Sequence, residues 1–111
     1  MKQFVVLIAV AMSLAFAACA SSITAADAKA LVQKGAVLVD VRTPEEFSGG
    51  HIEGALNIPI DDLDARKGEL KKDADIVVYC RSGGRSARGK ALLAGAGYTK
   101  VHDLGAMSNW K

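Results

Sequence analysis

Cysteine, histidine and proline are scarce in this chain, whose 111 residues include two Cys, two His and two Pro. So few Cys and His residues, with none paired at the spacing of metal ligands, give no reason to expect a metal site. An excess of charge of one sign is also absent, since 14 basic residues face 12 acidic ones for a formal net charge of +2. This balance excludes the strongly basic surface typical of nucleic-acid-binding proteins, so no nucleic-acid partner is expected.

The longest hydrophobic run lies at the N-terminus. Residues 4–18 are apolar apart from one serine and follow a short segment with a single positive charge. That length suits the hydrophobic region of a secretory signal and is too short for a membrane-spanning helix, which needs about 18 or more apolar residues. Small residues then permit cleavage after Ala17 or Ala20. We therefore predict a signal peptide over residues 1–20, export of the chain and one domain over residues 23–111. An uncleaved anchor or a buried N-terminal helix is the alternative.

Cys19 leaves a second possibility for the end of the signal. The sequence Ala17-Ala18-Cys19 resembles the end of a bacterial lipoprotein signal, in which the Cys is acylated, although Phe16 stands where that pattern usually has an aliphatic residue. We favour a soluble exported product, with a lipoprotein anchored through Cys19 as the alternative. In both cases Cys80 has no cysteine partner, and a leftover Cys in an exported protein indicates a reactive thiol or an intermolecular bond. A buried, inert thiol is the other interpretation, because free Cys is among the most buried residue types.

Strand-like segments alternate with segments of helical periodicity along the rest of the chain. Residues 36–41 and 76–79 are continuous hydrophobic runs, as expected for strands buried on both faces of a sheet. The expected order is helix 24–35, strand 36–41, helix 43–47, strand 55–59, helix 60–70, strand 76–79, helix 86–96 and strand 100–104. This alternation predicts an α/β domain with a mainly parallel central sheet flanked by helices. In such a domain the functional site lies beyond the carboxyl ends of the strands.

Two threonines mark the expected starts of helices. Thr24 is followed three residues later by Asp27, and Thr43 is followed directly by Pro44 and three residues later by Glu46. A hydroxyl at the N-cap, proline in the first turn and an acid three residues after the cap together predict a capping box at Thr43.

The main candidate for chemistry is Cys80, which follows the second buried strand and opens a Gly-rich loop. Gly83 and Gly84 allow the tight backbone in which successive N–H groups point inward at the sulfur. The positive end of the next helix and the nearby cations also favour the thiolate, which is the reactive form of cysteine. A plain turn between strand and helix, with solvated arginines, is the alternative. The predicted site consists of the catalytic Cys80 and the substrate-binding residues Arg81, Ser82, Gly83, Gly84, Arg85 and Ser86.

At these residues the sequence resembles the rhodanese family, and the resemblance covers essentially the whole chain after the signal. The segment Leu38-Val39-Asp40-Val41-Arg42 is similar to the opening of a rhodanese domain. Residues 43–59 resemble the most recognisable motif of the family, and residues 78–86 resemble its active-site loop. Near the end, Ala106 stands where a second glycine is frequent in the family. The chain looks most like single-domain periplasmic members.

This resemblance implies a rhodanese-like domain and a thiosulfate sulfurtransferase. Cys80 would take the outer sulfur of thiosulfate or a polysulfide as a persulfide and release sulfite. It would then pass that sulfur to an acceptor such as cyanide, a thiol or a protein, without any other cofactor. Arg81 and Arg85 would orient the small anionic donor. Four residues separate Cys80 from Arg85, whereas the related phosphatases have five, so the shorter loop favours sulfur over phosphate. We expect the protein to act as a monomer.

Two other functions remain open. The first is a persulfide carrier or redox partner that passes sulfur to another protein, and the second, less favoured, is a phosphatase or arsenate reductase on the same fold. The resemblance also implies that Asp40 and Arg42 are architectural residues near the site, in keeping with the rule that buried charges are usually paired. His51 is expected to hydrogen-bond within its loop rather than to act as a base. Contact with a membrane is expected only if Cys19 carries lipid.

Overall fold

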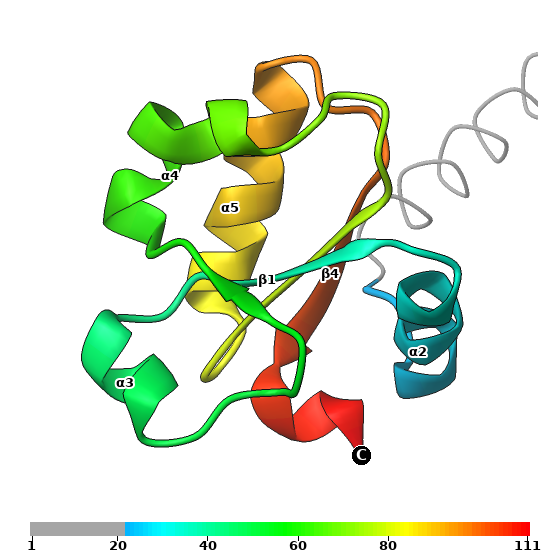
Figure 1. Ribbon diagram of the computed structural model, residues 1–111, viewed down its shortest axis with the longest axis vertical. Coiled ribbons are helices and arrows are strands. Elements are labelled where there is room, and N and C mark those ends of the chain that lie inside the picture. Colours follow the sequence, from blue (N-terminus) through cyan, green and yellow to red (C-terminus); the bar gives the residue numbers. More distant parts are fainter. Residues whose placement is uncertain (1–21) are drawn as a thin grey trace, which may run out of the picture.

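The computed structural model describes residues 22–111, so the predictions on the signal peptide and on Cys19 lie outside the described residues. At the centre is a sheet of four parallel strands in the order β2-β1-β3-β4 (Figure 1). These strands are β1 (Val37–Asp40), β2 (Leu56–Asn57), β3 (Ile76–Cys80) and β4 (Val101–Ala106). The predicted α/β fold with a parallel central sheet is confirmed.

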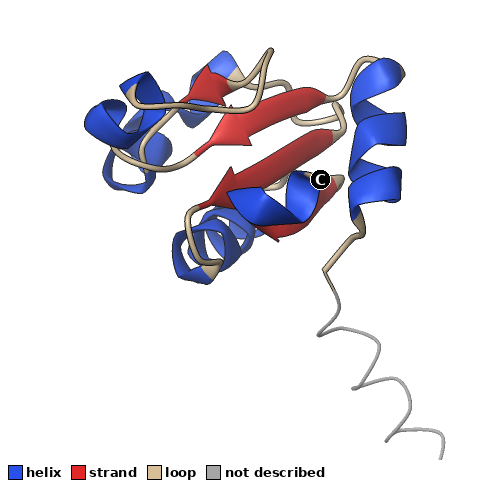
Figure 2. Cartoon of the chain, turned by 90° about the horizontal axis from the view of Figure 1, so that it is seen from below, coloured by secondary structure: helices blue, strands red, loops and turns tan. Residues whose placement is uncertain are grey.

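Helices pack on both faces of the sheet (Figure 2). The helices are α2 (Ala25–Gln33), α3 (Pro44–Ser48), α4 (Ile60–Arg66) and α5 (Gly84–Gly95), with the short 3₁₀ helices η1 (Lys67–Glu69) and η2 (Met107–Trp110). Helices α4 and α5 cover one face, and α2 with η2 covers the other. Within residues 22–111 no helix is long and apolar enough to cross a membrane.

The two central strands divide their side chains between these two layers. Val78 and Cys80 belong to the buried cluster that includes Leu93 of α5. Val77 and Tyr79 belong to the cluster on the α2 side. This alternation follows from the two-residue period of a strand, and it points the Cys80 side chain toward the face that α5 covers.

The strand order places a switch in chain direction at the centre of the sheet. From β1 the chain runs to β2 on one side, and it then crosses to β3 on the other side of β1. Asp40 at the end of β1 pairs in register with Tyr79, the residue before Cys80. The carboxyl ends of β1 and β3 therefore lie side by side where the connections diverge, which is where ligands bind in open parallel sheets.

Both predicted helix starts are confirmed. The Thr24 hydroxyl accepts a hydrogen bond from the Asp27 N–H at 3.1 Å. At α3 the Thr43 hydroxyl accepts from the Glu46 N–H at 3.2 Å, while Glu46 Oε1 accepts from the Thr43 N–H at 3.0 Å. This is the reciprocal arrangement of a capping box, with Pro44 in the first turn.

The helix expected over residues 60–70 is shorter than predicted. Its α-helical part ends at Arg66 and continues as the 3₁₀ helix η1, which contains Gly68. Glycine is unfavourable in the interior of an α-helix. In addition, the Tyr98 hydroxyl lies 2.6 Å from the carbonyl oxygen of Lys67, to which it donates a hydrogen bond. A partner distant in sequence thus satisfies a carbonyl group at this helix end.

Two boundaries near the site also differ from the prediction. Helix α5 begins at Gly84, two residues earlier than expected, because Gly83 takes a left-handed backbone with φ 108° and caps it. Strand β4 continues to Ala106 instead of ending before Gly105. The pairing of β3 with β4 shifts register there, and Gly105 has φ 85°, as in a β-bulge.

The contribution of α5 to stability is testable at Leu93, whose side chain is fully buried. Leu93→Ala is expected to lower the free energy of unfolding by about 2–5 kcal/mol, because it removes buried methyl groups and leaves a cavity. Urea unfolding followed by circular dichroism measures this loss. Leu92→Ala makes the same change at a partly buried neighbour and should cost less. Equal losses for the two variants would contradict the packing of α5.

Candidate active site

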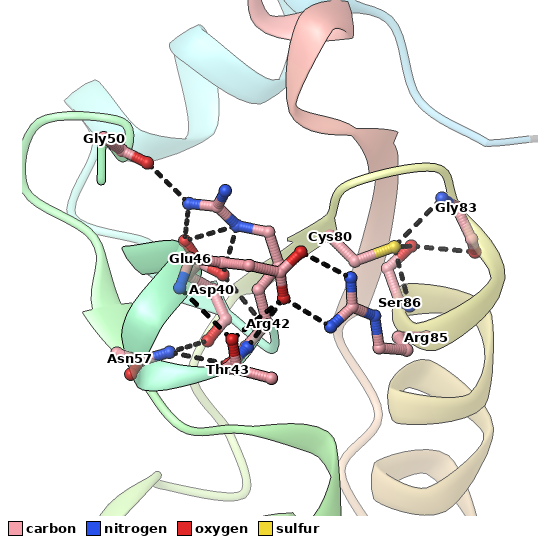
Figure 3. Close-up of polar contacts among 10 residues, drawn as sticks. All are labelled: Asp40, Arg42, Thr43, Glu46, Gly50, Asn57, Cys80, Gly83, Arg85 and Ser86. Atoms are coloured by element: carbon pink, nitrogen blue, oxygen red, sulfur yellow. Dashed lines mark hydrogen bonds and ion pairs between the residues drawn. The ribbon is translucent and has the colours of Figure 1, made fainter. Parts of the chain in front are cut away.

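Cys80 ends β3, and α5 begins directly after the short loop formed by residues 81–83 (Figure 3). The Cys80 side chain has 0% of its surface exposed to solvent. A strand end and a helix start are therefore brought together around a buried sulfur atom.

Backbone and side-chain groups of the loop and of the first turn of α5 surround this sulfur. The Gly83 N–H donates a hydrogen bond to Cys80 Sγ at 2.9 Å, and the Ser86 N–H donates one at 3.3 Å. Ser86 Oγ lies 3.5 Å from the sulfur and 3.1 Å from the carbonyl oxygen of Gly83, so its one proton is within reach of either atom. Two of the predicted inward N–H groups, those of Gly83 and Ser86, therefore reach the sulfur.

These contacts determine the pKa of the Cys80 thiol. Burial raises the pKa because it disfavours the charged form, while the Ser86 side chain and the backbone N–H groups of Ser86, Gly83 and Ser82 lower it. The hydrogen bonds outweigh burial, so the pKa lies below its ordinary value. The site therefore favours the thiolate, which is the nucleophilic form.

Arg85 makes a contact that the sequence did not predict. Its Nη1 and Nη2 atoms donate to the two carboxylate oxygens of Glu46 at 2.7 Å and 3.0 Å (Figure 3). This two-pronged pair raises the pKa of Arg85. The same pair, with the hydrogen bonds from Thr43, lowers the pKa of Glu46 from 4.5 to about 2. The contribution of the Glu46–Arg85 pair to the stability of the fold is therefore fully present above about pH 4.5. It is lost as the pH falls toward about 2, where Glu46 becomes protonated in the folded protein.

Glu46 is the functional-site residue that sequence reasoning missed. The capping box accounted fully for an acid at this position, and 39 residues separate it from Arg85. No local pattern connects positions so far apart. The prediction that Arg85 orients the donor stays a prediction, and the structure adds that Glu46 holds its guanidinium group.

Asp40 and Arg42 form a buried ion pair beside the loop. Arg42 Nη2 lies 2.7 Å from Asp40 Oδ2 and also donates to the carbonyl oxygen of Gly50 at 2.7 Å. The amide of Asn57 donates to the backbone carbonyl oxygens of both residues at 3.0 Å. The pair thus fastens the end of β1 to the segment that precedes β2, which is an architectural arrangement. The hydrogen bond to Asp40 is the largest cause that raises the pKa of Arg42.

A pocket of about 290 Å³ opens at this edge of the sheet. It is lined by Arg42, Glu46, Gly49, Gly50, Arg81 and Met107. The Arg81 side chain is exposed and takes part in none of the ion pairs among the described residues. Arg81 is therefore the cation of the pocket that is free to meet an anion, whereas Arg42 is committed to Asp40.

The two histidines lie in other arrangements. His51 is exposed, its Nδ1 lies 2.9 Å from the carbonyl oxygen of Phe47, and the two rings stack with centroids 3.7 Å apart. This agrees with hydrogen bonding within the loop. His102 pairs with Asp75 at 3.0 Å. Within residues 22–111 no group of three or more His, Cys, Asp or Glu side chains could hold a metal ion.

A buried cysteine with a lowered pKa, held between a parallel strand and a helix, defines the chain as an α/β protein with a cysteine loop at the carboxyl edge of its sheet. Residues 24–111 match the family described as "Rhodanese-like domain". The protein therefore belongs to the rhodanese family, which confirms the resemblance inferred from its motifs.

Curated relatives agree with this assignment. The chain is 44% identical to a "Sulfurtransferase" of Allochromatium vinosum over 75 residues, which cover 67% of this chain and 70% of that protein. It is 34% identical to "Thiosulfate sulfurtransferase PspE" of Escherichia coli over 73 residues, which cover 64% of this chain and 70% of that protein. It is also 43% identical to the "Uncharacterized protein YqhL" of Bacillus subtilis over 76 residues. That match covers 68% of this chain and only 60% of YqhL.

A solved structure supports the fold. The human single-domain sulfurtransferase TSTD1 superposes with a TM-score of 0.71 at 30% sequence identity. The match covers 82% of this chain and 95% of the human protein. The four-stranded parallel sheet and its flanking helices are thus a rhodanese fold.

The hydroxyl of Ser86 provides a test of how the thiolate is stabilised. Ser86→Ala is expected to raise the pKa of Cys80, because it removes the side-chain contact that lowers this pKa. At a pH below the titration midpoint, the rate of Cys80 alkylation should fall about fivefold, as expected for one hydrogen bond of about 1 kcal/mol. Ser82→Ala is the matched control, because Ser82 contributes only its backbone N–H. Equal rates for wild type and Ser86→Ala would rule out this role.

The buried pair beside the loop should be a determinant of stability. Asp40→Asn leaves the Arg42 guanidinium without its counter-charge in a site where Arg42 is 5% exposed. We expect the free energy of unfolding to fall by about 3–5 kcal/mol, the usual cost of removing one partner of a buried pair. Urea unfolding is the measurement, and Asp64→Asn at an exposed ion pair is the control with little effect. A loss below about 1 kcal/mol would contradict the architectural role.

Proposed function

We propose that this protein is a thiosulfate sulfurtransferase that works through a persulfide on Cys80. The observation that carries the proposal is the lowered pKa of a thiol that receives hydrogen bonds from the Gly83 and Ser86 N–H groups. The names of the relatives from Allochromatium vinosum and Escherichia coli support the same reaction class.

In the first half of the reaction, the Cys80 thiolate attacks the outer sulfur of thiosulfate. A bond forms between the two sulfur atoms, and the bond between the outer sulfur and the sulfonate breaks. Sulfite leaves with the electron pair of that broken bond, and Cys80 carries a persulfide anion. The Gly83 and Ser86 N–H groups, which donate to Cys80 Sγ, would stabilise the negative charge of the persulfide. Arg81, which lines the pocket, attracts the anionic donor.

In the second half, a nucleophilic acceptor takes the outer sulfur from the persulfide. With cyanide, a carbon–sulfur bond forms, the sulfur–sulfur bond breaks, and thiocyanate leaves while the Cys80 thiolate is regenerated. A thiolate acceptor reacts in the same way and leaves as its own persulfide. The cradle that favours the thiolate in the resting protein also makes it a good leaving group in this step.

The length of the loop supports sulfur rather than phosphate as the transferred group. The loop has four residues between Cys80 and Arg85, one fewer than the related phosphatases. For the location, we propose export under the N-terminal signal, because residues 1–20 carry the features of a cleaved leader.

Treatment with thiosulfate tests the proposed reaction. Incubation of the intact protein should add the mass of one sulfur atom at Cys80 and release an equal amount of sulfite, and cyanide should then remove that sulfur as thiocyanate. Intact-protein mass spectrometry and colorimetric assays of sulfite and thiocyanate measure these products. Cys80→Ser is the control and should give neither product. Wild-type protein without the adduct, or with rapid hydrolysis of phosphate esters instead, would overturn the proposal.

A further inference from the structure

The Glu46 carboxylate links two parts of the site that are distant in sequence. Oε1 accepts hydrogen bonds from the Thr43 N–H and Thr43 hydroxyl at 3.0 Å and 3.1 Å. The same oxygen accepts from Arg85 Nη1 at 2.7 Å, and Oε2 accepts from Arg85 Nη2 at 3.0 Å. The capping box of α3 thus fixes the carboxylate, and the carboxylate fixes the arginine (Figure 3).

Arg85 stands close to the sulfur and yet is turned to another partner. It lies in the first turn of α5, directly before Ser86, which contacts Cys80 Sγ. The hydrogen bond to Glu46 is the largest cause of the raised pKa of Arg85, and a smaller contribution comes from Cys80, as expected for groups near one another. Both ends of its guanidinium fork nevertheless point to Glu46. An anion at the loop must compete with this carboxylate for the arginine.

Most of the charged side chains in and beside the pocket are paired with one another. Glu46 lines the pocket together with Arg42 and Arg81. Arg42 is neutralised by Asp40, and Arg85 is neutralised by Glu46. One cation, Arg81, is left in this pocket without a charged partner among the described residues. A single free cation attracts an anion but holds it weakly.

We propose that Glu46 is a positioning residue that withdraws Arg85 from anions at the Cys80 loop, so that the leaving sulfite is not trapped. This inference rests on the proposed function, because it assigns a role in the release of the anionic product. Two free arginines with forked donors beside a helix start would bind sulfite or sulfate tightly. Glu46 replaces one of these potential contacts with an internal pair. Glu46 therefore lowers the affinity of the site for the anionic donor and speeds the release of the anionic product.

Binding of inorganic sulfate to four proteins tests this role without any need for turnover. The proteins are wild type, Glu46→Gln, Arg85→Gln and the double variant, and isothermal titration calorimetry gives the dissociation constants. Glu46→Gln keeps the shape of the side chain and removes its charge. We expect it to tighten sulfate binding about fivefold, the scale of a partly exposed ion pair worth about 1 kcal/mol. In the double variant this gain should vanish, because no arginine is then released.

Glu45→Gln is the matched control, because Glu45 lies on the same turn of α3, is exposed, and loses the same charge. We expect it to change the sulfate dissociation constant less than twofold, the small effect of an exposed surface charge. Arg85→Gln in the wild-type background should also change it by less than about twofold, because Glu46 already holds that arginine. This last comparison stays decisive even if Glu46→Gln does not fold.

Steady-state kinetics with thiosulfate and cyanide give a second test. If Glu46 had only a structural role, its substitution would not strengthen inhibition by sulfite. For Glu46→Gln we expect a lower KM for thiosulfate, a lower inhibition constant for sulfite and a reduced kcat, since product leaves more slowly. A parallel loss of kcat/KM without tighter sulfite inhibition would overturn the proposal. So would unchanged sulfate binding in Glu46→Gln, an equal gain in Glu45→Gln, or a loss of more than tenfold in Arg85→Gln. If wild type forms no persulfide, the proposed function is wrong. The sulfate titrations still show in that case whether Glu46 keeps Arg85 from binding anions.

Discussion

A negative charge on a sulfur atom without solvent contact is stable only where fixed dipoles replace the missing water. Cys80 meets this condition, since its side chain is fully buried and yet the N–H groups of Gly83 and Ser86 bond to its sulfur. Unlike water, these groups need not reorganise when charge leaves or returns to the sulfur. Their positions depend in turn on the left-handed backbone of Gly83, on the end of β3 and on the start of α5. The remainder of the sheet and its helices holds those three features in place.

Most of the arginines at this edge of the sheet form ion pairs with acidic side chains. Arg42 pairs with Asp40 in a buried ion pair, and Arg85 pairs with Glu46 in a partly buried one. Each pair also crosses between segments, because Arg42 reaches Gly50 and Glu46 belongs to the cap of α3. The pairs therefore set the geometry of the site and limit its net charge at the same time. The described acids thus neutralise two of the arginines at this edge, and the fixed N–H dipoles of Gly83 and Ser86 act on the sulfur directly.

How well the sequence predicts each feature depends on how local its cause is. The buried strands, the capping box at Thr43 and the cradle after Cys80 all arise from neighbouring residues, and all three were predictable. The pair of Glu46 with Arg85 and the hydroxyl of Tyr98 on Lys67 join segments that are far apart in the chain, so no local pattern announces them. The bulge at Gly105 has a similar origin, because the register of β4 against β3 decides whether that glycine continues a strand or turns. The role of each loop residue toward a substrate remains a prediction.

The early start of α5 has a consequence for when the thiol becomes reactive. Gly83 is the N-cap of the helix and its N–H donates to the sulfur, and the Ser86 N–H donates to the sulfur from the first turn, so these contacts exist only while that turn is formed. In an unfolded chain the same cysteine is an ordinary thiol with a pKa of about 8.5. Folding therefore lowers the pKa of this thiol. In a nascent or misfolded chain the Cys80 thiol lacks these hydrogen bonds, so its pKa is lowered only once the strand, the loop and the helix have come together.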